Sequence, residues 1–137
     1  MNTDLPDIDP GTRVARQERI LTIPLPDAKV EFLCNLDGNV DAVGASLRLS
    51  YIPYKSVLDG DGFAAYLKDL PAPDDAPSAM ETVAAVILDD LNNELVPRWL
   101  QLVLTRQRQD GTVQRVLVED KQPRWDNKTL IGRAGGL

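Results

Sequence analysis

The spacing of hydrophobic residues along the chain changes period several times, and each period predicts a different kind of element. The clearest strand covers residues 45–51, where hydrophobic and polar side chains alternate. Residues 18–23 and 29–33 alternate in the same way and predict two shorter strands. The Asp-Gly-Asn sequence at 37–39 favours a turn between the second of these strands and the clearest one.

Hydrophobic residues in the middle of the chain recur every three to four positions, which is the period of a helix with one buried face. Residues 59–70 predict a first helix, with Asp59 or Asp61 as its N-cap. Residues 78–95 predict a second, longer helix, which begins with a Ser-x-x-Glu capping-box sequence. Prolines follow both predicted helices and are expected to end them.

From residue 99 the period returns to two. Strands at 99–105 and 113–118 are separated by the hairpin signal Asp110-Gly111. The order strand, strand, helix, helix, strand, strand predicts an α+β fold, in which a four-stranded antiparallel sheet carries both helices on one face. Because such a sheet has open edges, we expect the protein to form a homo-oligomer through them.

The length of 137 residues leaves room for one domain. We expect a flexible N-terminal arm at residues 1–17, a single domain at 18–120 and a C-terminal tail at 121–137. The composition, 43% hydrophobic and 26% charged, is typical of a globular protein. No apolar run is long enough for a bilayer and the N-terminus does not have the character of a signal peptide, so we expect a cytoplasmic protein with no membrane partner.

The charged and reactive residues restrict the chemistry further. A net charge of −6 argues against nonspecific binding to nucleic acid, which depends on Lys and Arg neutralising phosphates. The chain has no histidine and only one cysteine, Cys34. Ser-His-Asp and Cys-His catalysis, an internal disulfide and the usual zinc sites are therefore excluded, and no metal is expected.

Cys34 and Asp41 are the candidate reactive pair, because seven positions and a predicted turn separate them. In one interpretation the thiol is a nucleophile, and the turn places the carboxyl beside it as a proton donor. In the other interpretation Cys34 is a small buried residue and Asp41 belongs to a surface turn. The residues alone leave both interpretations open.

Four stretches of the chain, taken in order, are similar to one known family. The first is Cys-Asn-Leu-Asp-Gly-Asn-Val-Asp at 34–41, which precedes a strand that ends Tyr51-Ile52-Pro53. The second is the segment 59–66, and the third is Met80-Glu81 followed by Ile-Leu-Asp-Asp-Leu at 87–91. The fourth is Pro-Arg-Trp-Leu at 97–100. The set resembles the nitrile reductases called QueF, which have the tunnelling fold (T-fold). Members of that family reduce 7-cyano-7-deazaguanine with NADPH in the queuosine pathway of tRNA modification.

The resemblance implies a role for each residue that matches a family motif. Cys34 would add to the nitrile carbon to give a thioimidate, and Asp41 would protonate the nitrile nitrogen. Glu81 would accept hydrogen bonds from the deazapurine ring. Asp59 and Met80 would stand at the other substrate-side positions. The implied partners are a small-molecule deazapurine and further copies of the chain, with the sites at the subunit interfaces.

The resemblance also defines variants of this function. The family's two NADPH-associated lysines fall on Asp61 and Ala64, so amine transfer to the thioimidate is a variant of reduction by NADPH. The alternative to both is a non-catalytic T-fold oligomer that keeps a purine or pterin pocket or has a structural role. In that case Asp59 is only a helix cap, and Glu81 completes the capping box that Ser78 begins.

Overall fold

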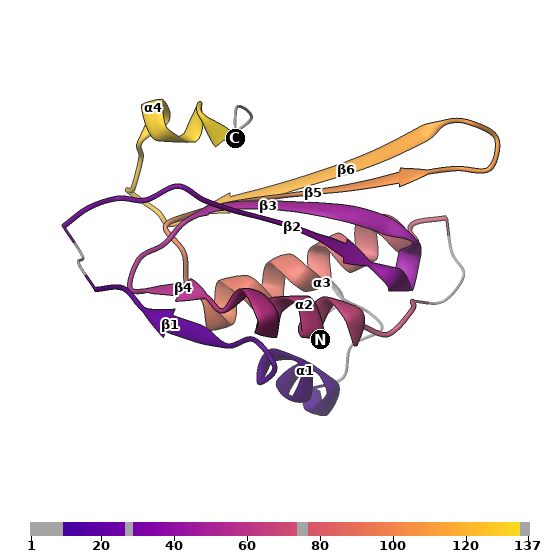
Figure 1. Cartoon of the computed structure of the whole chain (residues 1–137), viewed down its shortest axis with the longest axis horizontal. Coiled ribbons are helices and arrows are strands. Elements are labelled where there is room, and N and C mark those ends of the chain that lie inside the picture. Colours follow the sequence, from indigo (N-terminus) through magenta and orange to yellow (C-terminus); the bar gives the residue numbers. More distant parts are fainter. Residues whose placement is uncertain (1–9, 27–28, 74–76, 135–137) are drawn as a thin grey trace.

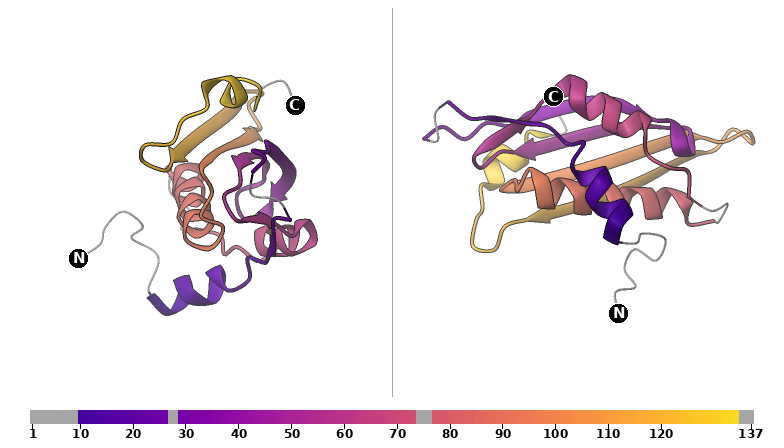
Figure 2. Two further views of the ribbon diagram at one scale, coloured as in Figure 1. Left: turned by 90° about the vertical axis from the view of Figure 1, so that its left-hand side faces the viewer. Right: turned by 90° about the horizontal axis from the view of Figure 1, so that it is seen from below.

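The computed structural model of the chain describes residues 10–26, 29–73 and 77–134. Its centre is a four-stranded antiparallel sheet in the order β2-β3-β5-β6 (Figure 1). The strands are β2 (Cys34–Val40), β3 (Ala45–Ile52), β5 (Trp99–Gln107) and β6 (Val113–Lys121). The helices α2 (Gly60–Lys68) and α3 (Ala79–Glu94) cover one face of this sheet (Figures 1 and 2). The predicted α+β fold, with an antiparallel sheet and helices on one face, is confirmed.

Leucines of the two central strands form the floor of the core. The register pairs Leu47 of β3 with Leu104 of β5, and Leu49 with Leu102, so these side chains lie in adjacent rows under the helices. All four leucines are buried. A fully buried leucine contributes about 1.5–3 kcal/mol relative to an exposed one. The helices close the core with the buried residues Phe63, Tyr66 and Leu67 of α2 and Val83, Ile87 and Leu91 of α3.

The C-terminal segment packs on the opposite face of the sheet and covers one end of it. Ile52 and Trp99 are paired across β3 and β5 and point away from the helices, yet both are buried. Ala134 and residues around the short helix α4 (Lys128–Ile131) cover them. This part of the tail therefore belongs to the folded protein, and α4 lies across the sheet from α2 and α3 (Figure 1).

The predicted flexible arm is partly a helix. Residues 1–9 lie outside the described residues, whereas residues 10–17 form α1 (Pro10–Gln17). Arg16 and Gln17, at the end of α1, are buried against α3. After α1, the short strand β1 (Thr22–Pro24) pairs with β4 (Ser56–Leu58) in a separate two-stranded sheet. None of the helices in the described ranges is long and apolar enough to cross a membrane.

Two expectations about the first half of the sheet are wrong. Residues 29–33 do not form a strand, and residues 37–39 lie inside β2 rather than in a turn. The chain reverses instead through a 3-10 turn, η1 (Asp41–Val43), and through Gly44, whose φ of 63° is left-handed. Pairing with β3 along the whole of β2 overrides the local turn preference of Asp-Gly-Asn.

Gly38 lets helix α2 approach strand β2 closely. A Cβ atom at this position would lie 2.9 Å from the Cδ1 atom of Leu67, whose side chain is buried. A larger residue would therefore displace the Leu67 side chain from its place in the core. The glycine that the sequence presented as part of a turn is a packing position.

We expect Gly38→Val to lower the free energy of unfolding by about 1–3 kcal/mol because it overpacks this contact. Gly60→Ala is the matched control, because a Cβ atom at Gly60 would meet nothing within 4 Å. Urea unfolding followed by circular dichroism measures both variants. Equal stability of Gly38→Val and the wild type would show that α2 does not depend on this close approach.

Candidate functional site

The structure does not bring Cys34 and Asp41 together within one chain. Cys34 is the first residue of β2, and Asp41 follows the last. At the usual rise of a strand, their Cα atoms are on the order of 20 Å apart. The predicted bend between them is absent, because the residues expected to form it continue the strand. The thiol and the carboxyl lie at opposite ends of the sheet.

Cys34 is half-buried on the helix side of the sheet, directly opposite Tyr51 of β3. The Tyr51 hydroxyl donates to the sulfur and accepts from the backbone N–H of Leu58 at 3.0 Å. Burial raises the pKa of the Cys34 thiol, and the hydrogen bond from Tyr51 opposes this only in part. Burial likewise raises the pKa of Tyr51 to about 12. This neutral pair connects β2 with β3 and with the end of β4.

Asp41 and Glu81 are both exposed. Asp41 begins η1, which contacts α2 and α3. Glu81 is in the first turn of α3, and that turn lies at the same end of the sheet as η1 (Figure 1). The predicted capping box is not formed, because the Ser78 side chain makes no cap hydrogen bond.

Asp59 and Met80 have structural roles. The Asp59 carboxylate accepts from the backbone N–H of Gly62 at 3.1 Å, which confirms Asp59 as the N-cap of α2. Met80 is 1% exposed and belongs to the main core, so its side chain does not reach a surface where a ligand could contact it.

A groove of about 320 Å³ lies between α2 and β2, which is an edge strand of the sheet. Leu36, Phe63 and Leu67 give it an apolar floor. Asp41 and Lys68 put opposite charges on its rim. Ala64, which the resemblance to QueF aligned with an NADPH-associated lysine, lines the same groove. Of the residues singled out in the sequence, the groove therefore gathers Asp41 and Ala64.

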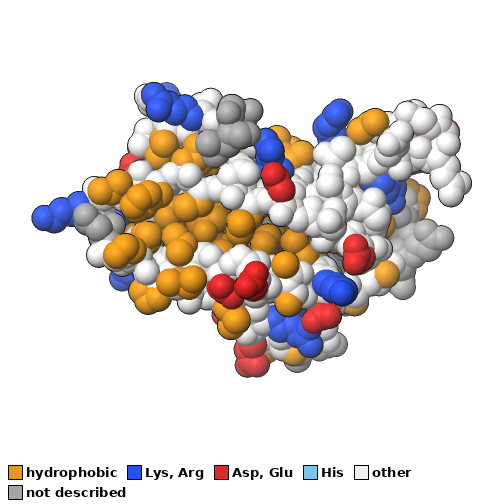
Figure 3. All heavy atoms as spheres, viewed as in Figure 1, with side chains coloured by type: hydrophobic (Ala, Val, Ile, Leu, Met, Phe, Trp, Pro, Cys, Tyr) orange, Lys and Arg blue, Asp and Glu red, His pale blue; other side chains and the backbone are white. Residues whose placement is uncertain are grey.

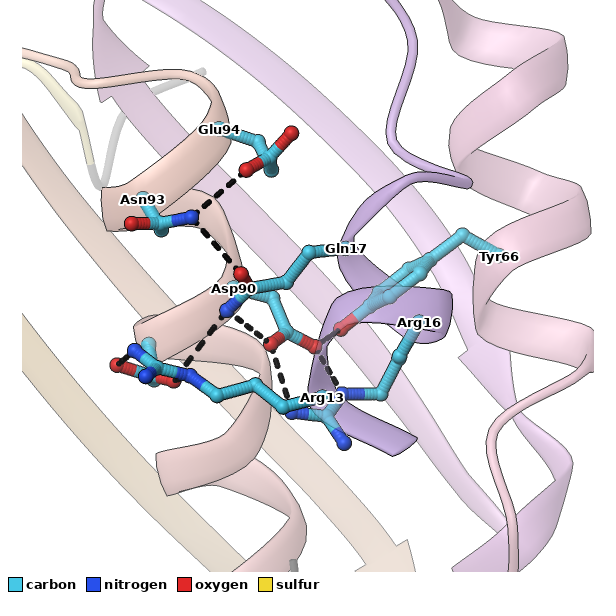
Figure 4. A network of polar contacts seen from close by, with 8 residues as sticks. Arg13, Arg16, Gln17, Tyr66, Asp90, Asn93 and Glu94 are labelled. Atoms are coloured by element: carbon cyan, nitrogen blue, oxygen red, sulfur yellow. Dashed lines mark hydrogen bonds and ion pairs between the residues drawn. The ribbon is translucent and has the colours of Figure 1, made fainter. Parts of the chain in front are cut away.

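The best-built polar cluster centres on Asp90, to which the sequence reasoning assigned no role (Figure 4). Asp90 is 0% exposed. It accepts from the Arg16 guanidinium at 2.5 and 2.8 Å, from the Tyr66 hydroxyl at 2.5 Å and from the Gln17 side chain at 3.0 Å. Burial raises the pKa of Tyr66 above its ordinary value, and the nearby Asp90 carboxylate adds to this effect. A sequence signal existed, because position 90 shares the apolar face of α3 with Ile87 three residues earlier.

Comparison with known proteins adds no identification. No protein-family model matches the chain, and no curated protein matches it. Within the described residues, no group of three or more His, Cys, Asp or Glu side chains is placed to hold a metal ion.

The environment of Cys34 makes a prediction about its reactivity. Because burial raises the thiol pKa, we expect iodoacetamide to modify Cys34 at neutral pH several-fold more slowly than in the urea-unfolded chain. The rate should keep rising with pH beyond the pH at which the unfolded chain has levelled off. Intact-mass measurement over a pH series gives both rates. A folded protein that reacts faster than the unfolded chain at neutral pH would contradict this.

Proposed function

We propose that this protein is a T-fold subunit that assembles through its sheet edges and binds a flat purine-like ring, such as a 7-deazapurine, without covalent chemistry. The observation that supports the proposal best is the groove between α2 and β2. It has an apolar floor and charged rim, and it opens along an edge of the sheet, where a second chain can complete it.

The two edges of the sheet are complementary in direction and pattern. Each pair of neighbouring strands is antiparallel, so β6 runs opposite to β2 and can extend the sheet of a second copy at β2. On the helix side, the half-buried Leu36 of β2 would lie near Val116 and Val118 of the second copy's β6. On the other side, Asp37 of β2 and Arg115 of β6 have opposite charges.

Hydrophobic side chains gather beside the β2 edge. Figure 3 shows them on the face where β1, β4 and the start of β2 lie in Figure 1. Four large apolar residues that lie in β1 or just before β1 and β2 are exposed: Leu21, Ile23, Val30 and Phe32. An exposed apolar area next to an open strand edge favours association with another protein surface, and a second copy of the chain brings a matching edge.

The groove suits a flat heterocycle with several hydrogen-bonding groups. Its volume of about 320 Å³ is at the small end of ligand sites. Asp41 can accept from ring N–H groups, and Lys68 can donate to a ring nitrogen or carbonyl. Asp41 on the same rim offsets the charge of this lysine, and a lysine beside a carboxylate does not suit the phosphates of NADPH.

The geometry favours binding over attack on a nitrile. An attacking thiol must ionise readily and lie beside its proton donor. The pKa of Cys34 is raised, and Asp41 lies at the other end of β2. Reduction by NADPH and amine transfer both require the thioimidate, so the non-catalytic alternative is the function that we propose.

Assembly can be tested by exchanging the two edge charges. We expect Asp37→Arg and Arg115→Asp each to weaken association about tenfold or more, because each places like charges across the proposed interface. The double variant should recover most of the loss. Glu18→Arg, at an exposed position directly after α1, which packs on α3, controls for the charge reversal of Asp37→Arg. Sedimentation velocity measures the wild type and all four variants. A wild type that stays monomeric, or single variants that assemble normally, would exclude this interface.

Ligand binding can be tested by filling the groove. We expect 7-cyano-7-deazaguanine to bind the wild type in calorimetry, and Ala64→Phe to weaken binding at least about tenfold by occupying the groove. Ala65→Phe is the matched control, because Ala65 is exposed on the same helix and does not line the groove. Intact mass should show no adduct. An adduct that Cys34→Ala abolishes would restore the catalytic interpretation, and no binding at all would exclude this ligand.

A further inference from the structure

The cluster around Asp90 has the arrangement of a binding site for a guanidinium group. Two guanidinium nitrogens of Arg16 approach the two carboxylate oxygens of Asp90 in a fork (Figure 4). Tyr66 of α2 donates to one of these oxygens and Gln17 to the other. The carboxylate is thus held in place from α2 while it faces the guanidinium. A planar fork fills such a site with two parallel hydrogen bonds, whereas an ammonium group offers a point charge.

Polar contacts hold α1 on the helix layer. The apolar side chain of Val14 is 54% exposed, and Ala15 is also exposed. Among residues 12–17, the part of α1 whose burial is described, Arg16 and Gln17 are the buried ones. Arg13 adds an exposed pair with Asp89 at 2.8 Å. A helix of eight residues is not stable alone in water, so α1 depends on these contacts for its structure.

We propose that Asp90 and Tyr66 form a guanidinium-binding site whose built-in ligand is Arg16. The ligand class is the arginine side chain, supplied here by the chain's own N-terminal helix. When Arg16 is absent, the site keeps a buried carboxylate without its cation and takes a free alkylguanidinium from solution. This site is separate from the groove beside β2 and does not depend on the function proposed for that groove.

The test opens the site and offers small cations to it. We expect Arg16→Ala to lower the Tm by on the order of 10 °C, because it leaves a buried carboxylate unpaired. Arg13→Ala removes only the exposed pair and should lower it by about 2 °C or less. Propylguanidinium at millimolar concentration should raise the Tm of Arg16→Ala along a saturable curve and recover at least half of the loss. Arg13→Ala and the wild type should not respond.

Propylammonium and urea are the matched control compounds. Propylammonium carries the positive charge without a planar pair of N–H donors, and urea has planar N–H donors without the charge. Equal stabilisation by either probe would overturn the proposal, as would no stabilisation by propylguanidinium. If Arg16→Ala does not fold alone, the same probes are added during refolding and the yield of folded protein is measured by circular dichroism. Recovery with propylguanidinium alone supports the site, and equal yields with all three probes exclude it.

Discussion

The structure depends on the burial of one sheet face beneath two helices. β3 and β5 supply adjacent rows of leucines, and α2 and α3 close over them. Antiparallel pairing puts the leucines on the same side of the sheet, so burial of one row helps to fix the register of the next. The edge strands β2 and β6 and the helices α1 and α4 lie around this centre.

The elements with the strongest hydrophobic period were predictable from the sequence. β3, α2, α3 and the β5–β6 hairpin form where alternation or helical spacing is clearest, because each buries its apolar face. β2 was not predictable, since Asp37-Gly38-Asn39 has a local preference for a turn. Its strand conformation depends on pairing with β3 and on the close approach of Leu67. The pairing joins consecutive strands, whereas the contact of Gly38 with Leu67 joins residues distant in sequence.

The candidate site shows the same division. Asp59 as a helix cap was predictable, because capping depends on neighbouring residues. The separation of Cys34 from Asp41 depends on the path of β2. Because a turn was predicted where β2 continues, the two residues were wrongly predicted to lie side by side. The role of Asp90 depends on Arg16, 74 positions earlier, which no local pattern connects to it. A carboxylate on the apolar face of a helix was the available signal, and its partner required the folded chain.

The contacts that hold α1 and α4 on the rest of the fold differ in kind, and this has a practical consequence. α1 is held on the helix layer, whereas α4 covers Trp99 on the other side of the sheet (Figure 1). Shortening the chain from its beginning would therefore uncover charged groups between helices, while shortening it from its end would uncover an indole ring. Removing α1 would therefore destabilise the fold by leaving a buried charge unpaired. Removing α4 would instead expose an apolar surface that favours aggregation.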